Sequence, residues 1–255
     1  MPHPLFEEFR AENRPTFARR LLDLLYPPKC TGCNRLLAEG DVFCPECKRK
    51  FSEQLQLTCP RCLKLFSECE CADSFLQNHG IRHIYKMYPY QSEKQDHPAN
   101  RLLYSLKENN DHYAVRFAVY LYARLIKEHR IDTRNLCVTY IPASYRRLYE
   151  SGADPMKRIA KALAKRLGCS CISPLCRLNR HAPAQKQLTK EERMDNAFRT
   201  YGVKRKTDLR GKRILLLDDI CTTGATLAAS AAAIRRAGAV RVTCLVLAKT
   251  AIKDK

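Results

Sequence analysis

Eight of the chain's 14 cysteines fall between Cys30 and Cys71, and they fall there in four close pairs. Two cysteines separated by two residues on a turn can direct both sulfur atoms at one metal ion, and two such pairs complete the four tetrahedral thiolates of a structural zinc site. Eight ligands therefore suit two zinc ions, without a free position for a catalytic water. The spacing does not determine whether neighbouring or alternate pairs share an ion. The predicted ligands are Cys30, Cys33, Cys44, Cys47, Cys59, Cys62, Cys69 and Cys71.

Two other uses of paired cysteines stay open, namely an iron–sulfur cluster and a disulfide framework. Residues 1–17 lack the basic run, long apolar run and cleavage site of a secretory signal. No stretch approaches the ~18 apolar residues of a membrane span. We therefore expect the protein in the cytoplasm, where the reducing environment favours metal ligation over disulfides. Metal binding would then supply much of the folding free energy of a domain of about 50 residues.

The length of 255 residues and a change of composition near residue 75 indicate two domains. We predict an N-terminal helix and cysteine-rich zinc-binding domain over residues 1–75, of the ribbon or finger type, and a second domain over residues 76–255. Before the cysteines, a short helical stripe of apolar residues is predicted to pack on the chain's own core. The stripe comprises Phe17, Leu21, Leu22, Leu24 and Leu25.

Beyond residue 75, segments rich in β-branched and aromatic residues alternate with segments of helical period, which is typical of an α/β fold with a parallel sheet covered by helices. Strands are predicted at 81–90, 136–141 and 240–247, and helices at 98–107 and 113–129. Asp154 followed by Pro155 predicts the start of another helix, which Gly168 ends.

The most informative segment is 213–226. Four consecutive apolar residues, 214–217, predict a strand buried on both faces. The acidic pair, Asp218 and Asp219, follows at the carboxyl end of this strand, where open α/β sheets bind ligands. Residues 222–226, the phosphate loop, then lead into an alanine-rich helix, so backbone N–H groups and the helix dipole converge on an anion. The loop consists of Thr222, Thr223, Gly224, Ala225 and Thr226.

The acidic pair repels a phosphate, so it requires another role. Carboxylates beside a phosphate loop accept hydrogen bonds from sugar hydroxyls or help to hold Mg²⁺. Phosphate, ribose and magnesium together describe a phosphoribosyl group. The alternative is a solvated strand end followed by an ordinary helix cap. Cys221 has no histidine placed near it by the sequence, and we interpret it as a small loop residue.

Residues 217–226 resemble the phosphoribosyl pyrophosphate signature of type I phosphoribosyltransferases. With the upstream cysteine pairs, they make nearly the whole chain similar to the ComF family of competence-associated proteins. Three further segments match the family's pattern. They are Ser105, Leu106 and Lys107 with Asp111, then Pro142 with Arg146 and Arg147, and finally Gln185, Leu188, Arg193, Asn196, Ala197 and Phe198.

The resemblance implies a type I phosphoribosyltransferase-like sheet with helices on both faces, and it implies roles for particular residues. The acidic pair would hold the ribose hydroxyls, and the phosphate loop would hold the 5′-phosphate. The loop with Ala143, Arg146 and Arg147 would lie by the pyrophosphate, where guanidinium groups would neutralise its charge. The family's role implies a cytoplasmic step in natural transformation that handles incoming single-stranded DNA, with proteins of the competence machinery as candidate partners.

One segment departs from the family's pattern. The family usually has Arg-Gly-Phe-Asn-Gln after the basic loop, whereas this chain has Ser-Gly-Ala-Asp-Pro at 151–155. Only the glycine is retained, so the resemblance assigns no catalytic residue in this segment.

Forty-six lysines and arginines against 26 acidic residues give a net charge of +20, which attracts polyanions. The basic residues are spread over the chain, and any phosphate-binding enzyme also gains from positive charge. Three functions stay open: a DNA-uptake factor that binds phosphoribosyl pyrophosphate and single-stranded DNA, a salvage or biosynthetic phosphoribosyltransferase, and a regulatory protein without turnover. The cysteine domain favours the first, because it resembles no usual salvage-enzyme hood.

Overall fold

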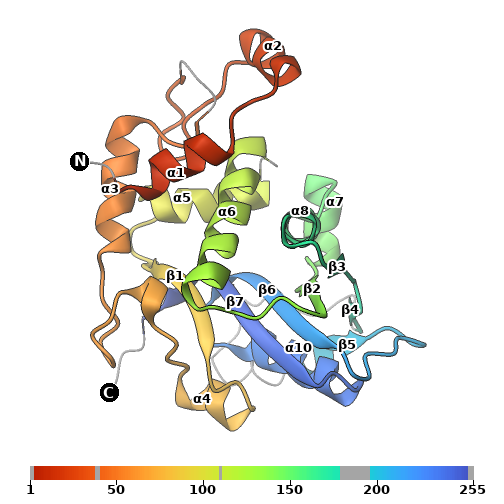
Figure 1. The fold of residues 1–255 in the computed structure, drawn as a ribbon. Coiled ribbons are helices and arrows are strands. Elements are labelled where there is room, and N and C mark those ends of the chain that lie inside the picture. The colour runs from red at the N-terminus through yellow and green to blue at the C-terminus, as the bar shows by residue number, and fades with distance from the viewer. Residues whose placement is uncertain (1–2, 38–40, 109–110, 179–195, 252–255) are drawn as a thin grey trace.

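The computed structural model describes residues 3–37, 41–108, 111–178 and 196–251. At its centre is a parallel five-stranded sheet in the order β1-β7-β6-β2-β3 (Figure 1). These strands are β1 (Ile84–Tyr90), β7 (Arg241–Thr250), β6 (Arg213–Cys221), β2 (Leu136–Tyr140) and β3 (Ser170–Cys171). A separate antiparallel pair consists of β4 (Leu175–Arg177) and β5 (Tyr201–Val203).

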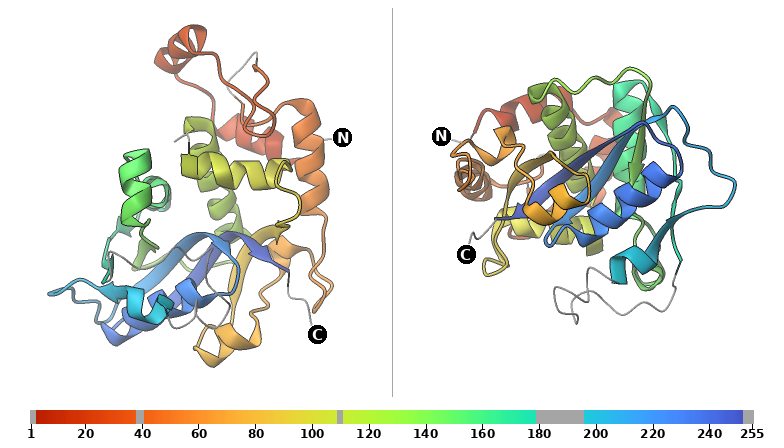
Figure 2. Two further views of the ribbon diagram at one scale, coloured as in Figure 1. Left: turned by 180° about the vertical axis from the view of Figure 1, so that it is seen from behind. Right: turned by 90° about the horizontal axis from the view of Figure 1, so that it is seen from below.

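Helices cover both faces of the sheet, as predicted (Figures 1 and 2). On one face lie α5 (Pro98–Glu108), α6 (His112–Glu128) and α8 (Pro155–Leu167), and on the other α4 (Ser74–Asn78) and α10 (Ala225–Arg236). The apolar run of β6 is continuous because both faces of this strand are covered. Leu215 and Leu217 join the core of α6 and α8, whereas Ile214 and Leu216 join the core of α10. Each face of the strand therefore has its own apolar layer.

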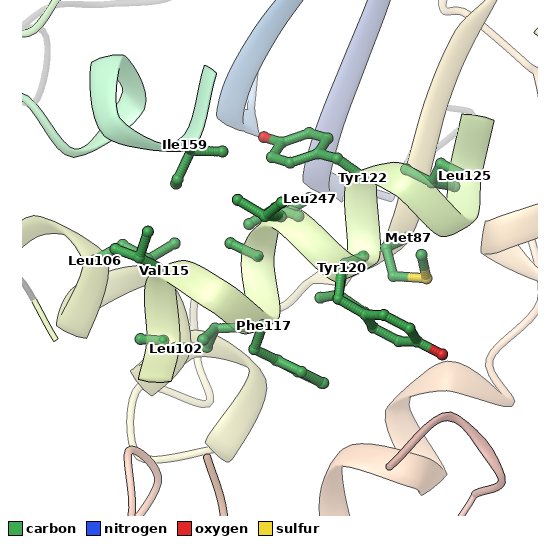
Figure 3. Close-up of a cluster of buried hydrophobic side chains, with 14 of the residues drawn as sticks. Met87, Leu102, Leu106, Val115, Phe117, Tyr120, Tyr122, Leu125, Ile159 and Leu247 are labelled. Atoms are coloured by element: carbon green, nitrogen blue, oxygen red, sulfur yellow. The ribbon is translucent and has the colours of Figure 1, made fainter. Parts of the chain in front are cut away.

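Helix α6 runs through the larger core and is buried on most sides. Figure 3 shows its side chains between Leu102 and Leu106 of α5, Ile159 of α8 and Leu247 of β7. An amphipathic helix would need only one apolar face, but α6 is also covered by the N-terminal part of the chain. Three of its aromatic residues, Phe117, Tyr120 and Tyr122, thus join the apolar core.

The N-terminal part contains α1 (Leu5–Glu12), α2 (Phe17–Leu25), α3 (Pro45–Leu55) and a 3-10 turn, η1 (Phe66–Glu68). Helix α1, helix α3 and Phe43 just before α3 pack on α6 through aromatic rings. Phe6 stacks on Phe117 with ring centroids 5.6 Å apart, and Phe51 and Phe43 meet the same ring at 5.6 and 5.8 Å. Residues of the cysteine-rich segment therefore share a core with the sheet-covering helices.

The stripe in α2 is not packed on the core, contrary to the prediction. Phe17 and Leu24 are 85% and 80% exposed. The helix is attached through its polar face instead, because the Arg19 guanidinium lies 5.0 Å from the Tyr113 ring centroid and the Tyr113 hydroxyl donates to Asp23. These polar contacts direct the apolar side chains outward.

Most predicted boundaries hold to within a few residues. The helix after Asp154 is capped as expected, since the Asp154 carboxylate accepts from the backbone N–H groups of Met156 and Lys157 at 3.0 and 3.2 Å. Gly168 ends it in the left-handed region, with φ of 65°. The first strand begins at Ile84 and not at residue 81.

Candidate functional site

The eight predicted metal ligands form two groups of four. In each group the ligand atoms lie within 4.8 Å of one another. The first cysteine site comprises Cys30, Cys33, Cys44 and Cys47, and the second comprises Cys59, Cys62, Cys69 and Cys71. Neighbouring pairs therefore share a site, which the spacing had left open. None of the cysteines forms a disulfide.

Both sites begin with the same backbone turn. In the first site the Cys30 N–H donates to the Arg35 carbonyl and the Asn34 N–H to the Cys30 carbonyl, both at 2.8 Å. The second site repeats these bonds between Cys59 and Lys64 and between Leu63 and Cys59, also at 2.8 Å. Asn34 and Leu63 have positive φ angles of 60° and 59°. This turn aims both sulfur atoms of a Cys-x2-Cys pair at one point.

Donors to sulfur surround both sites, which suits metal-bound thiolates. The Cys44 N–H lies 3.2 Å from the Cys30 sulfur, and the Cys71 N–H lies 3.4 Å from the Cys69 sulfur. In the second site the Nζ of Lys86 also donates to the Cys69 sulfur at 3.1 Å and to the Cys69 carbonyl at 2.8 Å. Four thiolates around zinc carry a net negative charge, so a buried ammonium beside them is favourable. The residues present fit structural zinc.

The acidic pair lies at the carboxyl end of β6, as predicted. Strand β6 pairs with β2 only as far as Leu217 but continues beside β7 to Cys221. The acidic pair therefore extends beyond the end of β2, at the edge where parallel sheets bind ligands.

Two neighbouring helices hold the acidic pair in place. The Tyr122 hydroxyl of α6 donates to the Asp218 backbone carbonyl at 2.6 Å. The Lys107 ammonium of α5 lies 2.9 Å from Oδ2 of Asp219. Burial, followed by the negative charge of Asp219, raises the pKa of Asp218 well above its usual range, whereas Lys107 acts to lower it. The site thus concentrates negative charge that one lysine partly offsets.

Gly224 lies in the middle of the phosphate loop and caps α10. Its φ of 80° lies in the left-handed region, and a Cβ placed there would come within 2.7 Å of Leu76 of α4. Only glycine fits both conditions. The Thr223 hydroxyl accepts from the Ala225 N–H at 3.4 Å, Thr222 is exposed, Thr226 is partly exposed and Ala225 is buried. The loop, which runs into the start of a 12-residue helix, therefore begins three residues after Asp219, where backbone N–H groups can bind an anion.

Cys221 is not a loop residue, contrary to the interpretation above. It is the buried last residue of β6, because β7 pairs with β6 that far. Burial raises the pKa of its thiol to about 11. The thiol is therefore protonated at neutral pH, which is consistent with the view that it is no nucleophile.

The expected basic loop is in part a helix. Residues Arg146 and Arg147 belong to α7 (Tyr145–Ser151), because the chain turns into a helix soon after Pro142. Arg146 is exposed. Ala143 stays outside the helix, and its N–H donates to the Asp154 carboxylate at 3.0 Å.

The segment that departs from the family's pattern has a structural role here. Asp154 both caps α8 and accepts from the Ala143 N–H, so it ties together the two ends of the segment that joins β2 to α8. Pro155 occupies the first position of α8, where no N–H is required.

The last spaced motif is described only in part. Gln185, Leu188 and Arg193 lie outside the described residues. Ala197 is buried in the core of α10, and the Phe198 ring lies 5.1 Å from the ring of His79.

Sequence reasoning missed two residues of these sites, Lys86 and Tyr122. A lone lysine inside an apolar strand was the available signal for Lys86. Tyr122 gave no signal, because a tyrosine on the apolar face of a helix is ordinary.

Comparison with known families agrees with this geometry. Residues 157–255 match the family model of the phosphoribosyl transferase domain, and residues 21–75 match that of the double zinc ribbon domain. A comparison with curated proteins gives no match. Among the described helices, none is long and apolar enough to cross a membrane. The chain therefore carries a phosphoribosyl transferase domain in an α/β fold, preceded by an N-terminal double zinc ribbon.

Proposed function

We propose that the phosphoribosyl transferase domain binds phosphoribosyl pyrophosphate together with Mg²⁺. The observation that carries this proposal is the acidic pair near the end of β6, followed within five residues by the Gly224 turn into α10. An anion at the helix start and sugar hydroxyls at the carboxylates require this order of groups.

Each part of the site has its own task. The phosphate loop, with Thr222, Thr223 and Thr226, holds the 5′-phosphate, and the acidic pair accepts hydrogen bonds from the ribose hydroxyls. Ala143, Arg146 and Arg147 lie on the pyrophosphate side. Mg²⁺ bound with the ligand would neutralise pyrophosphate charge and favour its departure.

Calorimetric titration of phosphoribosyl pyrophosphate with Mg²⁺ tests this proposal. We expect micromolar binding by the zinc-loaded protein, on the order of −8 kcal/mol. The double variant Asp218→Asn/Asp219→Asn should lose it, whereas Asp208→Asn, at an exposed carboxylate paired with Arg210, should not. No binding by the unaltered protein would contradict the proposal.

The affinity for phosphoribosyl pyrophosphate should change with pH in a defined direction. Because the pKa of Asp218 is raised, its carboxylate is lost early as pH falls, so the affinity should weaken toward acid pH. The same raised pKa means that this group stabilises the ligand-free fold below its unfolded pKa and loses that contribution as pH rises through the folded value. As pH falls, the affinity for phosphoribosyl pyrophosphate should therefore decrease while the stability of the ligand-free protein increases. Calorimetric titrations and thermal melts over one pH series measure the two quantities. A change of both in the same direction would contradict this prediction.

We further propose that the protein acts in the cytoplasm as a ComF-like factor of natural transformation, and that it handles incoming single-stranded DNA with proteins of the competence machinery. The net charge of +20 and the double zinc ribbon in the same chain support this role. Binding to single-stranded DNA should weaken steeply with salt. It should persist in the Asp218→Asn/Asp219→Asn variant, and failure to bind at low salt would overturn this role.

The second candidate is turnover as a phosphoribosyltransferase of salvage or biosynthesis, which the domain match favours. Such an enzyme should release pyrophosphate with one base or amine among a small panel of acceptors. Release with none would favour a regulatory ligand-binding protein.

A further inference from the structure

Helix α5 lies between the first cysteine site and the acidic pair. At its start, a Cβ added to Gly32 of the first site would lie 3.2 Å from the Pro98 side chain. Near its end, the Thr31 hydroxyl donates to Oδ2 of Asp111 at 3.0 Å, and Ser105 of α5 contacts the same oxygen at 3.5 Å. The turn between Cys30 and Cys33 therefore contacts the α5 region at both ends.

Asp111 connects these contacts to α6. Its other carboxylate oxygen accepts from the Tyr113 N–H at 2.9 Å and so caps that helix. Leu102 and Leu106 hold α5 against α6 from the apolar side (Figure 3). Helix α5 is thus linked to the first cysteine site through Asp111 and is held against α6 by apolar contacts.

The last turn of α5 presents Lys107 to the acidic pair. Its Nζ lies 2.9 Å from Oδ2 of Asp219, and the two side chains are 20% and 15% exposed. Water screens such a sheltered pair less than a surface pair. Two adjacent carboxylates repel each other and repel an anionic ligand, and an ammonium at this position offsets both effects.

We propose that Lys107 is a positioning residue of the phosphoribosyl site, and that the first cysteine site holds it there through Thr31 and Asp111. The inference rests on the proposed binding of phosphoribosyl pyrophosphate. It gives the zinc ribbon a task in ligand binding, because the turn that carries two zinc ligands also orders the helix that carries Lys107.

Calorimetric titration of phosphoribosyl pyrophosphate with Mg²⁺ into Lys107→Gln and Lys107→Arg variants tests the first part. Lys107→Gln should weaken binding at least about tenfold, and Lys107→Arg should restore most of it. The matched control is Arg101→Gln, which removes a cation from the same helix whose partner is Asp96 at 4.0 Å. It should leave the affinity unchanged.

Thr31→Val tests the second part, because valine keeps the shape and removes the hydroxyl. The affinity should fall roughly three- to tenfold, as expected for one hydrogen bond, while the zinc content by mass spectrometry and the melting temperature change little. Thr58→Val, at an exposed threonine beside the second site, is the control.

The outcomes separate cleanly. Unchanged or tighter binding by Lys107→Gln would overturn the inference alone. Normal affinity in Thr31→Val, or weakened affinity only in molecules that have lost zinc, would overturn the link to the cysteine site. If the unaltered protein does not bind, the proposed function fails and this inference fails with it.

Discussion

The two cysteine sites have the same first turn, but their surroundings differ. The first site adjoins a large apolar core, in which Phe43 and Phe51 meet at 5.3 Å and contact Phe6 and Phe117. Among the described residues, the core of the second site consists of Cys59, Phe66 and Cys69, with Cys62, Cys71 and Ala251 partly buried against it.

Polar contacts attach the second site to β1 and to the end of α6 instead. Lys86 of β1 donates to the Cys69 and Cys71 carbonyls at 2.8 and 3.2 Å. His129 lies 2.6 Å from the Ser67 carbonyl and 3.1 Å from Glu70. A group of four cysteines can therefore be supported by apolar burial or by hydrogen bonds, and the metal must supply more of the folding free energy where burial is small.

The largest expected difference between the two sites is in backbone protection after one cysteine ligand is replaced. Cys62→Ser should abolish backbone protection over residues 57–71, because zinc binding of roughly 10–16 kcal/mol supports a segment with almost no core. Cys33→Ser, at the matching position of the first site, should leave α3 protected through its aromatic contacts. Hydrogen exchange measures both, and equal loss of protection in the two variants would contradict the comparison.

A smaller effect is expected from removing one core ring at each site. Phe51→Ala should lower the free energy of unfolding by about 3–5 kcal/mol, since four rings around it cannot close the cavity. The loss of unfolding free energy for Phe66→Ala should lie at or below the lower end of that range, because the few residues around Phe66 can move into the cavity. Urea denaturation compares the two, and a larger loss for Phe66→Ala would reverse the comparison.

The smallest effect concerns the buried lysine. Lys86→Met removes a donor to the Cys69 sulfur and should weaken zinc binding at the second site about 10- to 100-fold, as for other groups that contact metal ligands. Lys48→Met is the control, because Lys48 pairs with Asp41 and not with a sulfur. Competition with a colorimetric chelator reports zinc release. Equal release from both variants would show that Lys86 does not support zinc binding.

Local patterns predicted the parts of the molecule that depend on neighbouring residues. The buried strand of 214–217, the carboxylates at its end and the Gly224 helix start were all predicted from the sequence, because each follows from consecutive residues. The helix start at Asp154 and Pro155 was confirmed for the same reason. The division at residue 75 and the ligand roles of the site residues stay predictions.

Features that depend on distant residues were missed or predicted wrongly. The outward-facing stripe of α2 depends on Tyr113, about 90 positions away. One prediction was wrong without such a contact, since Arg146 and Arg147 were predicted in a loop and lie in α7.

The sequence by itself determined the pairing of the cysteines along the chain, the strand–loop–helix over residues 213–236 and the α/β fold class, since spacing and periodicity record local geometry directly. Only the tertiary structure decided that neighbouring pairs share a metal site, that Lys107 reaches Asp219 and that Lys86 supports the second site. These contacts join segments far apart in the chain, and packing of the whole core brings them together.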